Sequence, residues 1–246
     1  MAPEAFKRSI RDLQVWCSSC MVAFSGPDPV GVLIGAKRPS GTLVHKIAVH
    51  PDHRRQGHGR HLLASLGSKL AILGPPRIVA EVPETLVPAR ELFGASGYVE
   101  EARLTDYVSD REANDVGEAA GMFVMPVTID DLAANGLLGE DHPQVCWQRS
   151  VETLTARKDD IAGLAVASDE RIEAYLLYTR TAEIVSLRSF IEDGGARLKH
   201  LLSRPGLRTF RFPKVHPAEI SQQLLETLGF RPAGGHLLYA ARARSD

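Results

Sequence analysis

Cysteine is scarce in this sequence of 246 residues, and long apolar runs are missing from it. Two of the three cysteines, Cys17 and Cys20, stand three apart in a stretch that resembles a strand, where such positions point to opposite faces, so no disulfide between them is expected. Together with Cys146 they are too few for a zinc site. No apolar run approaches the roughly 20 residues of a membrane-spanning helix, and residues 1–12 are too charged for a signal peptide. The sequence therefore predicts a cytoplasmic enzyme or binding protein without a metal.

A charge excess of either sign is also lacking. Lysine and arginine total 29 against 30 acidic residues, which gives a formal net charge of -1. No broad electrostatic preference for nucleic acid or for an anionic membrane follows, so neither is expected as a partner. The basic residues matter only where they cluster.

The first half of the chain predicts three hairpin strands followed by alternating helices and strands. Apolar patterning and turn signals place strands at 16–24, 30–36, 42–49, 78–82 and 98–108, and helices at 3–13, after residue 59 and at 87–93. This order is typical of a mixed sheet flanked by helices, in the α/β (α+β) class.

A polar stretch at residues 109–118 has almost no large apolar side chain and is interpreted as a linker. Beyond it the same order recurs, with strands at 161–167, 172–179, 183–190 and 207–212 and with helices after Gly195 and before Gly229. The second copy also has an extra strand and helix within residues 122–138. We therefore predict two tandem domains, residues 1–116 and 117–246, related by a weak repeat.

A glycine-rich loop between a strand and a helix carries the clearest chemical signal. The strand that ends at Val49 continues into Arg54-Arg55-Gln56-Gly57-His58-Gly59, and a helix with leucines on one stripe follows directly. Glycines let backbone amides approach a ligand, and a helix N-terminus offers unpaired N–H groups with a partial positive charge. With arginines beside it, this arrangement predicts a site for an anionic diphosphate. The Rossmann and Walker patterns require other spacings and are absent.

The segment from Ile47 to Gly59 resembles motif A of the GNAT acetyltransferase superfamily, and the segment from Glu91 to Tyr98 is similar to the next helix and Gly-Phe turn of that family. The resemblance implies two tandem GNAT-like domains, each with a mixed, mostly antiparallel sheet flanked by helices. It also implies acetyl-coenzyme A as the cofactor, with its pantetheine beside Val49 and its pyrophosphate on the loop amides. The implied cofactor-binding residues are Ile47, Ala48, Val49, Arg54, Arg55, Gln56, Gly57, His58, Gly59 and Arg60.

The two copies depart from the family pattern in different ways. The N-terminal copy lacks the usual first strand and helix, which in the family help to shape the acceptor pocket. In the C-terminal copy the loop is reduced to residues 190–197, with Glu192 and Asp193 where arginines would be wanted. Because these carboxylates would repel phosphate, one acetyl-coenzyme A per chain is expected, bound to the N-terminal copy. The C-terminal copy is interpreted as structural or substrate-shaping.

Acetyl transfer to an amine requires a group that accepts the ammonium proton. Strand alternation puts His45, Ile47 and Val49 on one face, and arylalkylamine-type GNAT enzymes are similar in placing a histidine four residues before the same valine. His45, whose imidazole ordinarily titrates near pH ~6.5, is therefore the predicted general base. The alternative is that His45 only packs in a half-buried position. Glu81 and Glu84 are weaker candidates.

The general acid is less evident. Many family members have a tyrosine four residues before the Gly-Phe turn, where this chain has Phe93, which cannot donate a proton. Tyr98, Tyr107 or water are the alternatives, or else this copy binds acyl-coenzyme A without catalysis.

Three functions are therefore weighed. The first is an N-acetyltransferase acting on a primary amine of a small molecule or peptide. The second is a non-catalytic acyl-coenzyme A-binding regulatory module, and the third is a scaffold, against which the cationic loop counts. The acceptor amine and the oligomeric state, with a homodimer among the alternatives, are left open by the sequence.

Overall fold

The computed structural model describes residues 3–110, 122–138, 145–207 and 209–243. The chain divides into two compact units, one formed by residues 1–103 together with 236–246 and the other by residues 104–235. The domain boundary that we predict between residues 116 and 117 falls outside the described residues. Each unit is described separately below.

The first unit is a mixed sheet with helices packed on it, in the strand order β1-β2-β3-β4-β11. Antiparallel pairing joins β1, β2 and β3, the strands β3 and β4 run parallel, and β11 is antiparallel to β4. The elements are α1 (Pro3–Asp12), η1 (Cys17–Ser19), β1 (Met21–Ser25), β2 (Asp28–Arg38), β3 (Gly41–Val49), η2 (Pro51–His53), α2 (His58–Leu73), β4 (Arg77–Pro83), α3 (Val87–Ala95), and parts of β5 (Val99–Asp110) and β11 (Arg231–Arg242).

Helix α2 is held in place by its leucine stripe, as the sequence predicts. Leu62, Leu63, Leu66 and Leu70 are each at most 3% exposed and pack in the core of the first unit. Burying a leucine contributes roughly 1.5–3 kcal/mol, so this stripe anchors the helix firmly on the sheet. The helix ends where Gly74 donates its N–H to the Leu70 carbonyl at 2.9 Å, just before two prolines. The loop that precedes α2 is therefore attached to a fixed support.

The prediction of a strand over residues 16–24 is wrong for its first part. Cys17–Ser19 form the 3-10 turn η1, in which the Cys20 N–H donates to the Cys17 carbonyl at 3.0 Å, and strand β1 begins only at Met21. Side chains three apart eclipse one another in a 3-10 turn, whereas on a strand they point to opposite faces. The argument that separates the two thiols therefore does not apply here, although both are free cysteines.

The second unit contains an antiparallel sheet in the order β6-β7-β8-β9 and a strand pair between β10 and β5. Its main core combines apolar residues of β8, β9, β10, α6 and α7. The strands 161–167 and 172–179 have the predicted bounds. The elements are β6 (Phe123–Pro126), α4 (Ile129–Ala134), η3 (Trp147–Arg149), α5 (Val151–Ala156), η4 (Lys158–Asp160), β7 (Ile161–Ala167), β8 (Ile172–Thr179), β9 (Ile184–Ser189), α6 (Ala196–Ser203), β10 (Thr209–Val215) and α7 (Gln222–Thr227).

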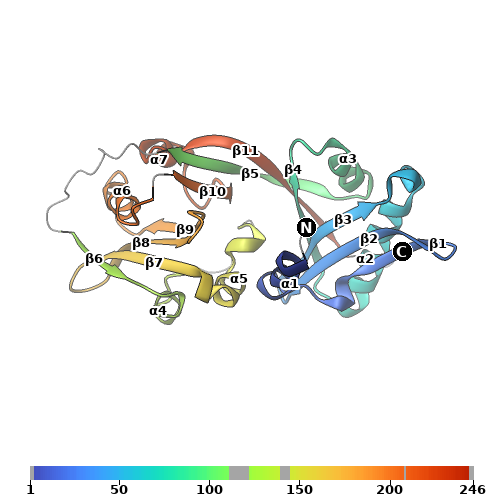
Figure 1. Ribbon diagram of the computed structural model, residues 1–246, viewed down its shortest axis with the longest axis horizontal. Coiled ribbons are helices and arrows are strands. Elements are labelled where there is room, and N and C mark those ends of the chain that lie inside the picture. Colours follow the sequence, from blue (N-terminus) through green and yellow to red (C-terminus); the bar gives the residue numbers. More distant parts are fainter. Residues whose placement is uncertain (1–2, 111–121, 139–144, 208, 244–246) are drawn as a thin grey trace. The chain divides into compact units, whose positions relative to one another are not determined.

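The closing strand of each copy runs from one unit into the other (Figure 1). Residues 236–242 of β11 pair with β4, and Leu237 and Tyr239 join the core of the first unit. Residues 105–110 of β5 pair with β10, and Tyr107 joins the core of the second unit. Each copy of the repeat therefore completes its partner copy's unit with its own last strand.

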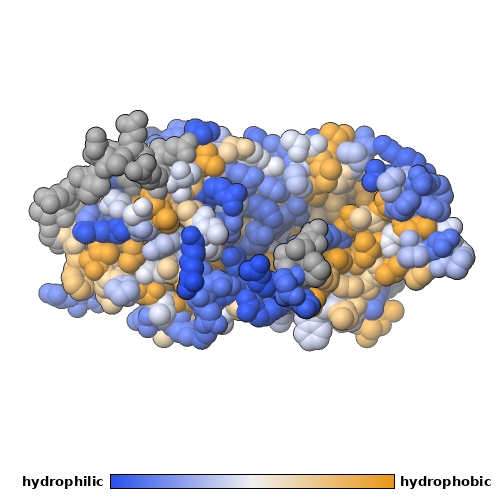
Figure 2. Space-filling model, in the orientation of Figure 1, coloured by the Kyte–Doolittle hydropathy of each residue, from blue (hydrophilic) through white to orange (hydrophobic). Residues whose placement is uncertain are grey.

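The outer edges of the two sheets differ. In the second unit the extra strand β6 pairs antiparallel with β7, whereas in the first unit β1, the equivalent of β7, is itself the last strand of the order. Val22 and Phe24 on β1 are 52% and 60% exposed, and hydrophobic residues are interspersed with hydrophilic ones on the face drawn in Figure 2. An edge strand of this kind leaves backbone groups unpaired on one side.

None of the described helices is long and apolar enough to cross a bilayer.

Candidate functional site

The predicted phosphate loop connects β3 to α2 and ends in an uncapped helix N-terminus. Gly57 is the N-cap of α2 and has left-handed backbone angles, φ 89° and ψ -10°, with no side-chain hydrogen bond capping the helix. The first hydrogen bond within the helix runs from the His61 N–H to the Gly57 carbonyl at 2.9 Å. The amides of His58, Gly59 and Arg60 therefore lack a partner inside the helix, and they carry the positive end of its dipole.

The side chains of the loop fasten its backbone from outside. The Arg54 Nε donates to the Val49 carbonyl at 3.2 Å, and the Gln56 side-chain amide donates to the Asp52 carbonyl at 3.0 Å. Arg55 has φ 62°, and its guanidinium lies 3.3 Å from the Glu91 carboxylate at 82% exposure. Because these contacts use carbonyls and carboxylates as acceptors, they leave the loop amides open to an anion.

The strand that leads into the loop separates from its neighbour. Thr42 pairs with Ile78 and Leu43 with Val79, and in the described part of the chain the parallel register of β3 and β4 ends there. On its other side β3 stays paired with β2 as far as Val49. The edge of β3 that carries the predicted residues Ile47, Ala48 and Val49 is thus not closed by β4. An extended ligand can hydrogen-bond to such an edge as an added strand does.

His45 occupies a bulge in β3. Lys46 pairs with Ile34 and Val44 with Gly35, so His45 is the extra residue between two paired positions. From His45 to Val49, half-buried and exposed residues alternate, which puts His45, Ile47 and Val49 on one face. The Nε2 atom of His45 is buried. The bulge therefore places the His45 ring with its Nε2 atom in the interior.

Two tyrosines lie against Phe93: Tyr98, which the sequence suggests, and Tyr239, which it does not. Phe93 is 3% exposed, and its ring lies 5.1 Å from Tyr98 edge-to-face and 5.9 Å from Tyr239 in a stacked arrangement. The Tyr98 hydroxyl is buried without a hydrogen-bond partner among the described residues, and burial raises its pKa. Tyr107, the other predicted candidate, packs in the core of the second unit instead. Tyr239 follows Phe93 by more than half the chain, so no local sequence signal links them.

A cavity of about 510 Å³ adjoins the phosphate loop in the first unit. Arg60 and His61 of α2 line one wall, Ser96 and Tyr98 another, and Arg242 of β11 a third. The hydroxyl groups of Ser96 and Tyr98 are both buried without a hydrogen-bond partner among the described residues. The two arginines on its walls make this cavity suited to a polar, anionic ligand.

The remaining candidates take other roles. Glu84 is ion-paired with Arg103 at 2.5 Å, so its carboxylate is already engaged. His50, His53 and His58 are neighbours around the loop, with ring centroids 5.8 and 6.1 Å apart in successive pairs. Over the described ranges, no three histidine, cysteine or acidic side chains gather in a group that could hold a metal ion.

A strand that leaves its neighbour and leads into an uncapped helix N-terminus is an arrangement suited to an extended ligand with an anionic end. Residues 2–98 match the model of the acetyltransferase (GNAT) family. The predicted resemblance to the GNAT superfamily is thereby confirmed, and acyl transfer is supported as the general type of activity. The comparison with curated proteins finds no match.

Solved structures share the fold along nearly the whole chain. A tandem GNAT protein from the clavulanic acid biosynthesis pathway superposes with a TM-score of 0.65 at 18% identity, covering 97% of this chain and 88% of that one. A GCN5-related N-acetyltransferase from Sphaerobacter thermophilus gives 0.64 at 15% identity, covering 92% and 81%. Another from Anabaena variabilis gives 0.68 at 10% identity, covering 99% and 67%. The prediction of two GNAT-like domains with mixed sheets flanked by helices is confirmed.

Proposed function

We propose that this protein is an N-acetyltransferase that moves the acetyl group of acetyl-coenzyme A to a primary amine of a small molecule or peptide. The observation that carries the proposal is the uncapped N-terminus of α2 after a strand whose edge is left open by β4. Few other ligands need both an amide cradle for a diphosphate and a strand edge for an extended arm. When bound, acetyl-coenzyme A would supply the acetyl group already activated as a thioester.

The residues of the first unit would hold this cofactor along three stretches. The amides from Gln56 to Arg60 would bind the pyrophosphate, and the edge of β3 at residues 47–49 would bind the pantetheine arm. The cavity lined by Arg60 and Arg242 would take the adenosine end, where the two guanidinium groups would pair with its phosphate. Arg60 belongs both to the loop and to the cavity, so the two sites are continuous.

His45 is proposed as the general base. Its position in the bulge, on the face of β3 shared with Ile47 and Val49, suits a group that takes the proton from the acceptor ammonium. The amine nitrogen then forms its bond to the acetyl carbon as the carbon–sulfur bond breaks. The sulfur leaves as a thiolate, which takes up a proton. Tyr239 is proposed to donate that proton, because its ring stacks on Phe93, where the family has its tyrosine.

The second candidate function is an acyl-coenzyme A-binding module without catalysis, which Phe93 favours because it lacks a hydroxyl. A thiol-release assay distinguishes the two. The purified protein is mixed with acetyl-coenzyme A and a panel of primary amines, and the free thiol is measured with and without each amine. An acetyltransferase releases thiol in an amine-dependent way, with acetylated amine formed in equal amount. Tight cofactor binding with no amine-dependent release across the panel would favour the module.

A further inference from the structure

The loop before helix α6 in the second unit has nearly the same backbone shape as the phosphate loop of the first unit. Gly195 is the N-cap of α6 with φ 88° and ψ 13°, close to the 89° and -10° of Gly57 before α2. A Cβ at Gly195 would also lie 2.7 Å from the Leu224 side chain, so glycine is required for space as well as for φ. Helix α6 therefore presents its first amides in the same way as α2.

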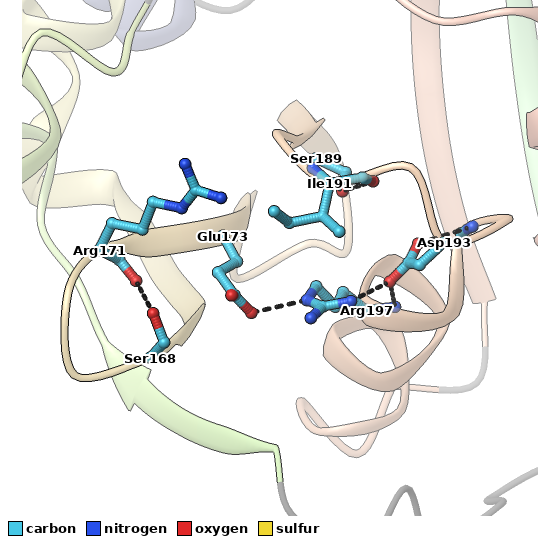
Figure 3. A network of polar contacts seen from close by, with 8 residues as sticks. Ser168, Arg171, Glu173, Ser189, Ile191, Asp193 and Arg197 are labelled. Atoms are coloured by element: carbon cyan, nitrogen blue, oxygen red, sulfur yellow. Dashed lines mark hydrogen bonds and ion pairs between the residues drawn. The ribbon is translucent and has the colours of Figure 1, made fainter.

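In the second unit these amides already have an anion. The Asp193 Oδ1 accepts a hydrogen bond from the Gly195 N–H at 2.9 Å, and Oδ2 accepts one from the Arg197 N–H at 3.1 Å (Figure 3). Asp193 stands two residues before the N-cap glycine, at the place that Arg55 has in the first unit. The Arg55 side chain is directed instead toward Glu91. The same backbone thus holds an internal carboxylate in one copy and leaves its amides open in the other.

Arg197 fixes that carboxylate in place. Its Nη1 donates to Asp193 at 2.7 Å and its Nε donates to Glu173 at 2.8 Å, and these three side chains are 14%, 17% and 21% exposed for Asp193, Glu173 and Arg197 (Figure 3). Burial by itself would raise the pKa of Asp193, but the hydrogen bonds from Arg197 and Gly195 outweigh it and lower that pKa below its ordinary value. Asp193 is therefore ionised at neutral pH. Two carboxylates around one guanidinium leave a net negative charge where a phosphate would bind.

Strand β10 of the second unit, the equivalent of β4, has engaged carbonyls as well. In the described residues a single parallel bridge joins Glu183, just before β9, to Arg211 of β10, so β10 leaves its neighbour as β4 does in the first unit. Pro213 and Lys214 lie in the register shift between β10 and β5 and have no partner residue on β5 in that register. Their carbonyls accept hydrogen bonds from the guanidinium of Arg149. Arg149 is in turn held by the Glu219 carboxylate at 2.8 and 3.1 Å. Breaking a buried, bidentate ion pair such as Arg149–Glu219 is costly, because it leaves a charge buried without its partner.

We propose that the second copy keeps the geometry of a diphosphate-binding groove and fills it with its own side chains. Asp193 takes the place of a phosphate on the amides of α6, and Arg149 engages two carbonyls of β10, the strand equivalent to β4. This extends the proposed function, in which the first copy binds acetyl-coenzyme A through the equivalent loop. The second copy is then closed to the cofactor by occupation, and not by charge repulsion alone. Removing the Asp193 carboxylate uncovers a latent site for a diphosphate or another doubly charged anion.

The test is a titration of ¹⁵N-labelled full-length protein with inorganic pyrophosphate, followed through the amide signals of Gly195 and Arg197. In the Asp193→Ala variant these signals are expected to shift and saturate, with a Kd at least about tenfold lower than in the wild type, because charge-assisted hydrogen bonds to the carboxylate no longer compete. The matched control is Glu192→Ala, which removes the same charge from the exposed neighbouring residue and leaves the cradle filled. This control is expected to behave like the wild type.

Two results would overturn the proposal: a folded Asp193→Ala protein whose Gly195 and Arg197 signals do not respond to pyrophosphate, or a Glu192→Ala protein that responds equally. Asp193→Asn keeps an oxygen on the same N–H groups without the charge, so it is expected to bind pyrophosphate more tightly than the wild type but more weakly than Asp193→Ala. Equal affinity of the alanine and asparagine variants would show that charge repulsion alone closes the site and would also overturn the proposal. Asp193→Gly serves if the alanine variant does not fold, since it also removes the side chain from the N–H groups. Acetyl-coenzyme A binding to the wild type, read from the Gly57 and Gly59 signals, tests the proposed function separately.

Discussion

Replacing Gly57 by alanine is expected to weaken the binding of acetyl-coenzyme A without unfolding the protein. Gly57 has φ 89°, where an L-residue is strained, and an added Cβ would meet no atom within 4 Å. The effect therefore comes from the backbone alone. A non-glycine residue in the left-handed region costs roughly 1–2 kcal/mol. The loop can relax by leaving this conformation, but its amides then no longer converge on the pyrophosphate.

The magnitude follows from that strain. If binding must restore the left-handed conformation, its cost of roughly 1–2 kcal/mol raises the Kd for acetyl-coenzyme A by a factor of about 5–30. Isothermal titration calorimetry measures the Kd, and thermal unfolding followed by circular dichroism checks the fold. Turnover at saturating cofactor is expected to stay close to the wild-type value, because Gly57 lies in the phosphate loop and not beside His45.

Two control variants separate this explanation from a general loss of stability. Gly94→Ala places a methyl group on helix α3 with no atom within 4 Å and no positive φ, so affinity is expected to be unchanged. Gly195→Ala introduces the same backbone strain in the second copy, together with a close approach to Leu224. It is expected to lower the melting temperature and leave the Kd unchanged. A folded Gly57→Ala protein whose Kd stays within about twofold of the wild type would refute the assignment of the loop amides as the pyrophosphate site.

Three further predictions concern single side chains. His45→Gln is expected to lower kcat by ~10²–10⁴-fold with cofactor affinity nearly intact, and a stable variant with full turnover and an unchanged acidic limb of the pH–rate profile would remove His45 from the mechanism. Tyr239→Phe is expected to lower kcat, whereas Tyr98→Phe is expected to stabilise the free protein by roughly 1 kcal/mol because it removes an unsatisfied buried hydroxyl; melting curves and steady-state kinetics of both variants check this. Asp193 has a lowered pKa, so its stabilising effect is present at neutral pH and is lost as pH falls through its folded-state pKa; denaturant unfolding should show the wild type more stable than Asp193→Asn at pH 7, with a difference that shrinks below about pH 4.

The sequence by itself determined the features that depend on neighbouring residues. The phosphate loop could be predicted because a left-handed glycine, a helix start and a leucine stripe lie within one short segment around Gly57. The strands at 161–167 and 172–179 could be predicted to the residue, since apolar patterning and turn signals are local. The presence of Phe93 where many family members have a tyrosine could also be predicted, because that position is defined by its spacing to Gly97.

Only the tertiary structure decided the features that depend on residues distant in the chain. The stacking of Tyr239 on Phe93 requires β11 to pair with β4, and no periodicity specifies which sheet a closing strand joins. The sequence indicated that Asp193 is a charge unfavourable for phosphate, but its contacts with the α6 amides and Arg197 depend on how the loop folds back on itself. Hydrogen bonds and strand pairing act over a few ångströms in space, and that proximity is set by packing of the whole chain and not by sequence spacing.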